Sequence, residues 1–337
     1  MGFVLCLVAA SGFGLAPLFA KQAYAGGLSV TTMLTVRFAL AALLLWAIVA
    51  IRRRPVRLPG RTLAVCVGLG AIGYALQGAA YFGAVSMIDA SLAALLLYTY
   101  PALTLILGVS LRRARADRRR VLALAVSGGG LVMLLGAGFD GGLGVLLALT
   151  AAGTYAVYLT VSETLPADLD VFLLTAIVCS SAAVSLALGG AATGGLHAPG
   201  AASAWLWVPV IAVIGTVLPI AAMFAGVRLV GASTAAILCG LEPAITVLST
   251  ALVFGERLTA AQLAGGAAIL AAVVILQLPA RKPAPAAVAP AALAPEPVAA
   301  PVPAGQAPAR SASISQRNAG TFGVNGSQPL IVPSSVQ

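Results

Sequence analysis

The sequence predicts an all-α membrane protein with about ten transmembrane helices, arranged as two inverted five-helix repeats with both termini in the cytoplasm. The chain of 337 residues is 61% hydrophobic and only 8% charged, whereas an average soluble domain has about 25% charged residues. Its apolar runs reach about 20 residues, the length that crosses a bilayer. An internal repeat relates the first half of the chain to the second.

The repeat has an offset of 142 residues, the interval from Pro101 to Pro243. The segment ASLAA at residues 90–94 precedes Pro101, and the similar segment ASTAA at 232–236 precedes Pro243. The same offset also aligns Gly73 with Gly215. We therefore predict two repeats, at residues 1–138 and 143–279.

Each repeat contains five apolar runs. In the first they lie near residues 3–24, 29–51, 62–83, 90–111 and 121–138, and in the second near 143–162, 170–190, 204–227, 232–254 and 259–279. A unit with an odd number of spans ends on the side of the membrane opposite to its start. Its copy must therefore insert upside down, which gives inverted repeats.

Basic residues predict the orientation, because Lys and Arg collect in cytoplasmic loops. Arginines crowd the loops at 52–61 and 112–120, while the copy of the second loop holds only Arg257. This pattern places both termini inside the cell. The net charge of +10 is therefore explained by loop arginines next to anionic lipid headgroups, and not by nucleic-acid binding.

The composition changes after the tenth apolar run. Residues 280–337 are rich in Ala and Pro and then in Ser, Asn, Gly and Gln. Such a segment has too few branched apolar side chains to form a core. We predict a disordered cytoplasmic tail.

Three ionisable residues lie inside the apolar runs: Glu242 near the middle of the ninth, Arg37 about two turns into the second, and Lys21 near the outer end of the first. A charge near the bilayer centre costs roughly 3 kcal/mol, so such groups face a cavity or a partner. For Glu242 two interpretations remain open. It is either protonated or paired with Arg37 as a structural group, or it takes part directly in substrate binding or proton coupling.

The repeat makes these positions asymmetric, since Glu242 corresponds to Tyr100, Arg37 to Cys179 and Lys21 to Glu163. This diversification of polar positions on a duplicated scaffold favours an asymmetric substrate site. Gln77 and Tyr81 are four residues apart in the third run and share one helical face, as a cavity wall requires.

Pro101 and Pro243 fall within the fourth and ninth runs. Each removes a backbone hydrogen bond and permits the helix to bend. We predict that they act as helix hinges beside the site.

Enzyme chemistry has no sequence support. The chain contains no G-x-S-x-G elbow and no Walker A motif. The four cysteines lie separately in apolar runs and His197 has no neighbouring ligand, so we expect no metal site, no catalytic residues and no cofactor.

The residues then resemble a known family. The segment Leu241-Glu242-Pro243, followed by VFGERL at 253–258 and the glycine pair at 265–266, is similar to the closing signature of EamA-type transporters of the drug/metabolite transporter (DMT) superfamily. The first repeat resembles it too, from SGF at 11–13 through Lys21 to Arg37-Phe38. The sequence departs from the family pattern at Ala114, where the first repeat often has the acidic residue that the second keeps as Glu256.

The resemblance implies a multi-pass protein of the bacterial inner membrane that works by alternating access. The expected function is secondary transport, with export of small amino-acid-like or drug-like metabolites. The expected partners are a small-molecule substrate and the lipid bilayer, and the sequence leaves proton coupling and a homodimer open. The predicted substrate-binding or coupling residues are Glu242, Arg37, Gln77, Tyr81, Tyr100 and Lys21. The competing hypothesis is a membrane assembly or regulatory subunit that transports nothing.

Overall fold

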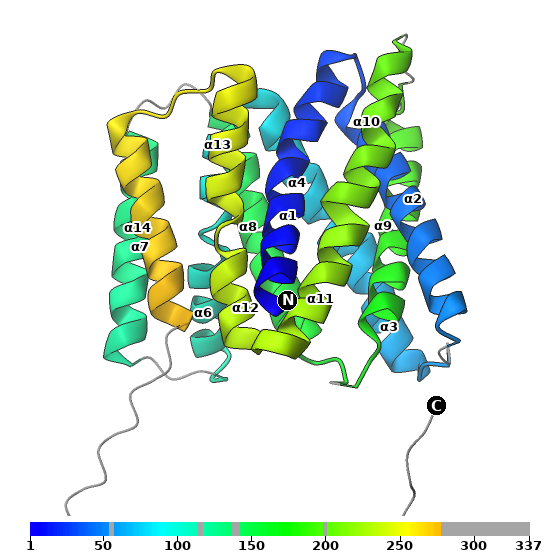
Figure 1. Ribbon diagram of the computed structural model, residues 1–337, viewed down its shortest axis with the longest axis horizontal. Coiled ribbons are helices and arrows are strands. Elements are labelled where there is room, and N and C mark those ends of the chain that lie inside the picture. Colours follow the sequence, from blue (N-terminus) through cyan, green and yellow to red (C-terminus); the bar gives the residue numbers. More distant parts are fainter. Residues whose placement is uncertain (54–56, 114–116, 137–141, 167, 198–200, 278–337) are drawn as a thin grey trace, which may run out of the picture. The chain divides into compact units, whose positions relative to one another are not determined.

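A computed structural model shows an all-helical bundle (Figure 1). The structure describes residues 1–53, 57–113, 117–136, 142–166, 168–197 and 201–277. The predicted tail at 280–337 lies outside the described residues, and so does Ala114.

The first repeat forms five helical spans, two of which are interrupted. Its elements are α1 (Gly2–Ala25), α2 (Val30–Ile51), α3 (Gly60–Gly68), η1 (Leu69–Tyr74), α4 (Ala75–Met87), α5 (Ala90–Leu97), α6 (Tyr100–Ser110) and α7 (Arg118–Gly136). The segment η1 is a π-helix that joins α3 to α4 within one span. The helix pair α5 and α6 makes a broken fourth span.

The second repeat has the same order of elements. They are α8 (Gly142–Ser162), α9 (Val171–Thr193), α10 (Ala202–Ala212), η2 (Val213–Val217), α11 (Leu218–Val230), α12 (Ala232–Cys239), α13 (Glu242–Phe254) and α14 (Ala260–Gln277). The π-helix η2 overlaps the position of η1 after the offset of the repeat. The break between α12 and α13 repeats the break between α5 and α6.

The helices are long and apolar enough for a membrane. Within the described ranges nine spans meet this criterion, and Ala260–Leu276 is a shorter apolar helix. In chain order, these nine spans and the shorter helix match the ten runs predicted from the sequence, which confirms the predicted fold class. The predicted position of both termini on the cytoplasmic side stays a prediction.

Packing joins the two repeats rather than separating them. The helix pairs with the most extensive contacts are α7 with α14, α2 with α9, α1 with α11 and α4 with α8, and each pair combines one helix from each repeat. Figure 1 shows α7 and α14 side by side at one edge of the bundle. The described helices therefore form one unit whose interior is shared by both repeats.

Many small residues are buried between the helices and many large apolar residues lie on the outside, as expected for a membrane protein. Alanines such as Ala9, Ala41 and Ala151 are fully buried, whereas Leu188 and Leu252 are largely exposed. Small residues let helix backbones approach closely, because lipid provides no hydrophobic force that drives helices together. The large side chains on the outside are free to contact acyl chains.

Candidate functional site: a cavity between the repeats

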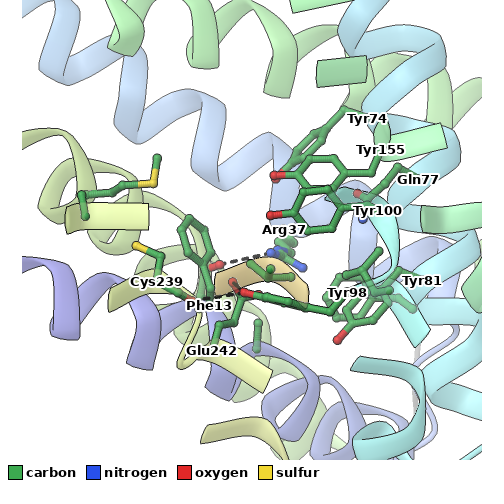
Figure 2. Close-up of a pocket in the computed structure, with 18 of the residues that line it drawn as sticks. Phe13, Arg37, Tyr74, Gln77, Tyr81, Tyr98, Tyr100, Tyr155, Cys239 and Glu242 are labelled. Atoms are coloured by element: carbon green, nitrogen blue, oxygen red, sulfur yellow. Dashed lines mark hydrogen bonds between the residues drawn. The ribbon is translucent and has the colours of Figure 1, made fainter. Parts of the chain in front are cut away.

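A cavity of about 350 Å³ lies inside the bundle. Its walls include residues from α1 and α2, from η1 with α4, from both halves of the broken fourth span, and from α8, α11, α12 and α13. The cavity therefore draws on both repeats. Figure 2 shows the side chains that line it.

The two broken spans each place a polar residue at the start of their second half-helix. Tyr100 begins α6 and Glu242 begins α13, and in both helices proline occupies the first turn. Proline is tolerated there because it has no N–H that needs a partner. Pro101 and Pro243 thus lie where the spans break, although their role as hinges stays a prediction.

The Glu242 carboxylate is held by Tyr98. The Tyr98 hydroxyl donates a hydrogen bond of 2.9 Å to Oε2 of Glu242 and lies 3.2 Å from the carbonyl oxygen of Cys239. That carbonyl is four residues before Pro243, so no proline N–H competes for it. The helix break therefore frees an acceptor that helps to orient Tyr98.

Helix α1 approaches the Glu242 backbone closely at Gly14. A Cβ atom at Gly14 would lie 2.7 Å from the carbonyl oxygen of Glu242, and Thr246 donates a hydrogen bond of 2.8 Å to the Gly14 carbonyl. Only glycine permits this contact without a shift of backbone. The start of α13 is thus fixed against α1.

Arg37 reaches the cavity from α2 and is 5% exposed. Its Nε donates to Oγ1 of Thr216 at 3.0 Å, and its Nη2 donates to the carbonyl oxygen of Gly215 at 3.2 Å. Both acceptors belong to η2, and π-helices occur frequently at functional sites. Among the described residues, no carboxylate forms an ion pair with Arg37, so the pairing with Glu242, one of the interpretations that the sequence left open, is not made.

Tyrosine rings form a large part of the wall. The Tyr100 ring lies 4.6 Å from the Tyr155 ring and 5.7 Å from the Tyr98 ring, measured between centroids. In Figure 2 the rings of Tyr74, Tyr100 and Tyr155 gather along one side of the cavity, with Glu242 and Cys239 on the other. Such a wall suits an apolar or aromatic body.

The cavity collects five of the predicted binding or coupling residues, namely Arg37, Gln77, Tyr81, Tyr100 and Glu242. Tyr74, the last residue of η1, lines the cavity as well. Lys21 lies elsewhere, at the opposite end of α1 from the N-terminus. The function of the six predicted residues in substrate binding or coupling stays a prediction.

Some lining residues were not predicted as site residues. Phe13, Tyr98 and Met223 line the cavity, and Thr216 positions Arg37 from outside the lining. Tyr98 and Thr216 are polar residues near the middle of a span, which was the available signal. Phe13 and Met223 have ordinary apolar character, so the sequence offers no such signal for them.

Lys21 belongs to a polar network at one end of the bundle. Its ammonium forms an ion pair with Glu256, which follows α13. Glu256 also accepts hydrogen bonds of 3.0 Å from the backbone N–H groups of Ala90 and Ser91, and one of 2.7 Å from the Ser91 hydroxyl. This carboxylate therefore joins α1 to the N-terminus of α5 and to the second repeat.

The geometry sets the charge state of Glu256. Burial alone would raise its pKa, but the hydrogen bonds from Lys21, Ser91 and Ala90 outweigh burial and lower the pKa to about 2. Gly255, with φ of 68°, ends α13 in the left-handed conformation and turns the chain just before Glu256. Burial and the nearby Glu256 charge raise the pKa of Asp89.

Comparisons with known proteins agree with this architecture. The model of the EamA-like transporter family matches residues 1–136 and 142–278. An uncharacterized transporter of Archaeoglobus fulgidus is 31% identical over 223 residues, which cover 66% of this chain and 78% of the relative. The uncharacterized transporter YcbK of Bacillus subtilis is 28% identical over 278 residues, which cover 78% of this chain and 88% of the relative.

A solved crystal structure has a TM-score of 0.58 and 18% sequence identity, covering 82% of this chain and 96% of the other. At that identity the likeness shows the fold alone. The two family matches coincide with the two predicted repeats and confirm the resemblance noted in the sequence. Members of this family are membrane transporters and not enzymes, as the sequence predicted, and their substrates are small molecules. The chain is a multi-pass membrane protein that belongs to the EamA-like transporter family.

Proposed function

We propose that this protein is a secondary transporter that exports small amino-acid-like or drug-like metabolites by alternating access through the central cavity. The observation that carries the proposal is the joint presence of Arg37 and Glu242 in the wall of one cavity without an ion pair between them. Two separate ionisable groups in a largely apolar wall can recognise polar groups of a substrate in a site that contains little water. We also propose the bacterial inner membrane as its location.

Two features support alternating access. Broken spans from both repeats border the cavity, so α5 with α6 and α12 with α13 can change their bend independently. The network around Glu256 ties the N-terminus of α5 to the loop after α13 at one end of the bundle. Breaking and remaking such contacts would let that end open and close.

Glu242 is the proposed coupling residue. A carboxyl that binds a substrate and a proton alternately can couple the transport of the substrate to that of the proton, because each of them changes the charge in the cavity. Tyr98 holds this carboxyl within the cavity. A homodimer is compatible with this scheme and not required by it, because both repeats needed for the cavity lie in one chain.

Metabolite efflux tests the proposal. Cells that overproduce the wild type, Glu242→Gln or Glu163→Gln would be compared for extracellular metabolites at matched protein abundance in the membrane. Glu163 is exposed and outside the cavity lining, so its variant is the control for loss of a carboxylate. We expect efflux of a specific compound with the wild type and Glu163→Gln, and its loss with Glu242→Gln.

Other outcomes separate the alternatives. If Glu242→Gln exports as well as the wild type, the carboxyl is structural and coupling through it is wrong. The competing function, a non-transporting subunit, predicts no change in any metabolite. It also predicts that a chain ending at residue 282 loses its cellular function as a subunit, while Glu242→Gln keeps that function.

A further inference from the structure

Arg37 is bound to the protein along one edge only. A guanidinium is a planar fork with five N–H groups. Thr216 and Gly215 occupy the edge that contains Nε and Nη2. Within the described part of the chain, Nη1 is buried and has no hydrogen-bond partner. The free end of the fork is therefore a strong donor that the protein leaves unused.

The charge of Arg37 is also uncompensated among the described residues. The carboxyl in the same cavity, Glu242, accepts its hydrogen bond from Tyr98 instead. The guanidinium carbon lies 4.8 Å from the ring centroid of Phe82 and 5.4 Å from that of Phe38. These rings attract the cation but provide no hydrogen-bond acceptor. A buried cation with a free donor needs an anion that comes from elsewhere.

The inverted repeat indicates that the scaffold does not need this charge. After the offset of the repeat, Arg37 corresponds to Cys179 and its partner Thr216 corresponds to Tyr74. The equivalent contact, between α9 of the second repeat and η1 of the first, is thus built without a cation. Since α9 packs on η1 with a neutral residue at this position, the positive charge in the first repeat calls for a reason other than folding.

The cavity also limits which anion fits. It contains the Glu242 carboxyl in addition to Arg37, so an ionised Glu242 would repel a doubly charged anion such as phosphate more strongly than a single carboxylate. A single carboxylate matches the geometry of a guanidinium fork. The rings of Tyr100 and Tyr155 offer contact to an apolar or aromatic body attached to it.

We infer that Arg37 is the docking residue for a carboxylate of the transported molecule, and that the substrates are monocarboxylate compounds with an apolar or aromatic body. Thr216 is a positioning residue, because it holds Nε and turns the free end of the fork away from η2. The inference rests on the proposed function, since it names the substrate class for the same cavity.

A pair of probes of equal size tests the inference without any mutation. 3-Phenylpropionate and its amide, 3-phenylpropanamide, differ only in the charged group. The measurement is the ligand-induced rise of the thermal unfolding midpoint of the purified wild-type protein, since binding to the folded state stabilises it. We expect the carboxylate to bind at least about tenfold more tightly than the amide, as expected for charge-assisted hydrogen bonds. Equal responses to both probes, or none to either, would overturn the inference.

Variants then locate the donor. Arg37→Gln should abolish the preference for the carboxylate over the amide, while Glu163→Gln keeps it. Thr216→Val should reduce the preference and Thr216→Ser should restore it, because serine keeps the hydroxyl that accepts from Nε. If Arg37→Gln does not fold, the two Thr216 variants and the wild-type comparison still decide. A full preference in Arg37→Gln would contradict the assignment.

The efflux assay separates this inference from the proposed function. Efflux that depends on Glu242, combined with equal binding of the two probes, would leave the transporter proposal intact and refute carboxylate docking. A clear carboxylate preference that depends on Arg37, without efflux of any compound, would support docking and refute the proposed export.

Discussion

Lys21 and Glu256 are 235 positions apart in the sequence and form an ion pair that connects the two repeats. The side chain of Glu256 is only 4% exposed. Four donors surround it: the Lys21 ammonium, two backbone N–H groups at the start of α5, and the Ser91 hydroxyl. The anion also lies at the positive end of the α5 dipole, a favourable place for negative charge.

Glu256→Gln should destabilise the protein by about 1–3 kcal/mol, because the backbone donors and Lys21 lose a charged acceptor. The measurement is the thermal unfolding midpoint of the purified protein at neutral pH. Glu163→Gln removes an exposed carboxylate and serves as the control. Equal midpoints for the wild type and Glu256→Gln would show that the network contributes no stability.

The same carboxylate should make stability depend on pH. Its pKa is about 2 in the folded protein against an ordinary value of 4.5. The contribution of Glu256 is therefore present above about pH 5, and it is lost as the pH falls through 4.5 toward 2. Unfolding midpoints measured from pH 6 to pH 3 should fall more steeply for the wild type than for Glu256→Gln. Parallel curves would contradict the lowered pKa.

Tyr98→Phe should reduce efflux roughly tenfold at unchanged membrane abundance, because Glu242 loses a hydrogen bond of the kind worth about 1.5 kcal/mol or more. Tyr24→Phe is the matched control, since its hydroxyl donates to the Phe82 carbonyl at 3.3 Å and the residue does not line the central cavity. If both variants lose efflux equally, the effect is general and not tied to Glu242.

Pro243→Ala should also lower efflux while the protein still inserts into the membrane. Alanine restores an N–H four residues after Cys239, and that donor would compete with Tyr98 for the Cys239 carbonyl. Pro209→Ala is the control, because Pro209 is exposed inside α10 and does not line the cavity. Normal efflux with Pro243→Ala would exclude a hinge function for this proline.

The predicted orientation can be tested with reporter fusions. Alkaline phosphatase folds to an active enzyme only outside the cytoplasm, so a fusion after residue 282 should be inactive and one in the loop at 194–201 should be active. The opposite pattern would reverse the topology inferred from the arginines at 52–61 and 112–120.

The sequence predicted the helices well because each span is a long apolar run, and lipid demands this wherever a helix crosses. The interruptions were only partly predictable. Pro101 and Pro243 mark the broken spans, whereas nothing comparable marks η1 and η2. A π-helix adds one residue to a turn without a distinctive residue type, so hydropathy alone does not reveal it.

The functional site, like the helices, could be predicted only in part from the sequence. Arg37 and Glu242 stand out as charges inside apolar runs, and the structure places both in one cavity. Lys21 stands out equally from its sequence position but pairs with Glu256 at one end of the bundle. The position of a residue along its span gives its depth in the membrane, but it does not show which distant segment of the chain contacts its side chain. Only the packing of α1 against the loop after α13 decides that.

The contacts between repeats bear on how this architecture could arise. Each main helix pair combines one helix from each half, and η1 and η2 occupy overlapping positions in the two halves. One half alone would leave its partner-facing helices bare and its half of the cavity open. A five-helix precursor of this kind would be complete only when two copies with opposite orientations in the bilayer met as an antiparallel pair. Fusion into one chain removes that requirement and allows Arg37 to differ from Cys179, since each position now exists once.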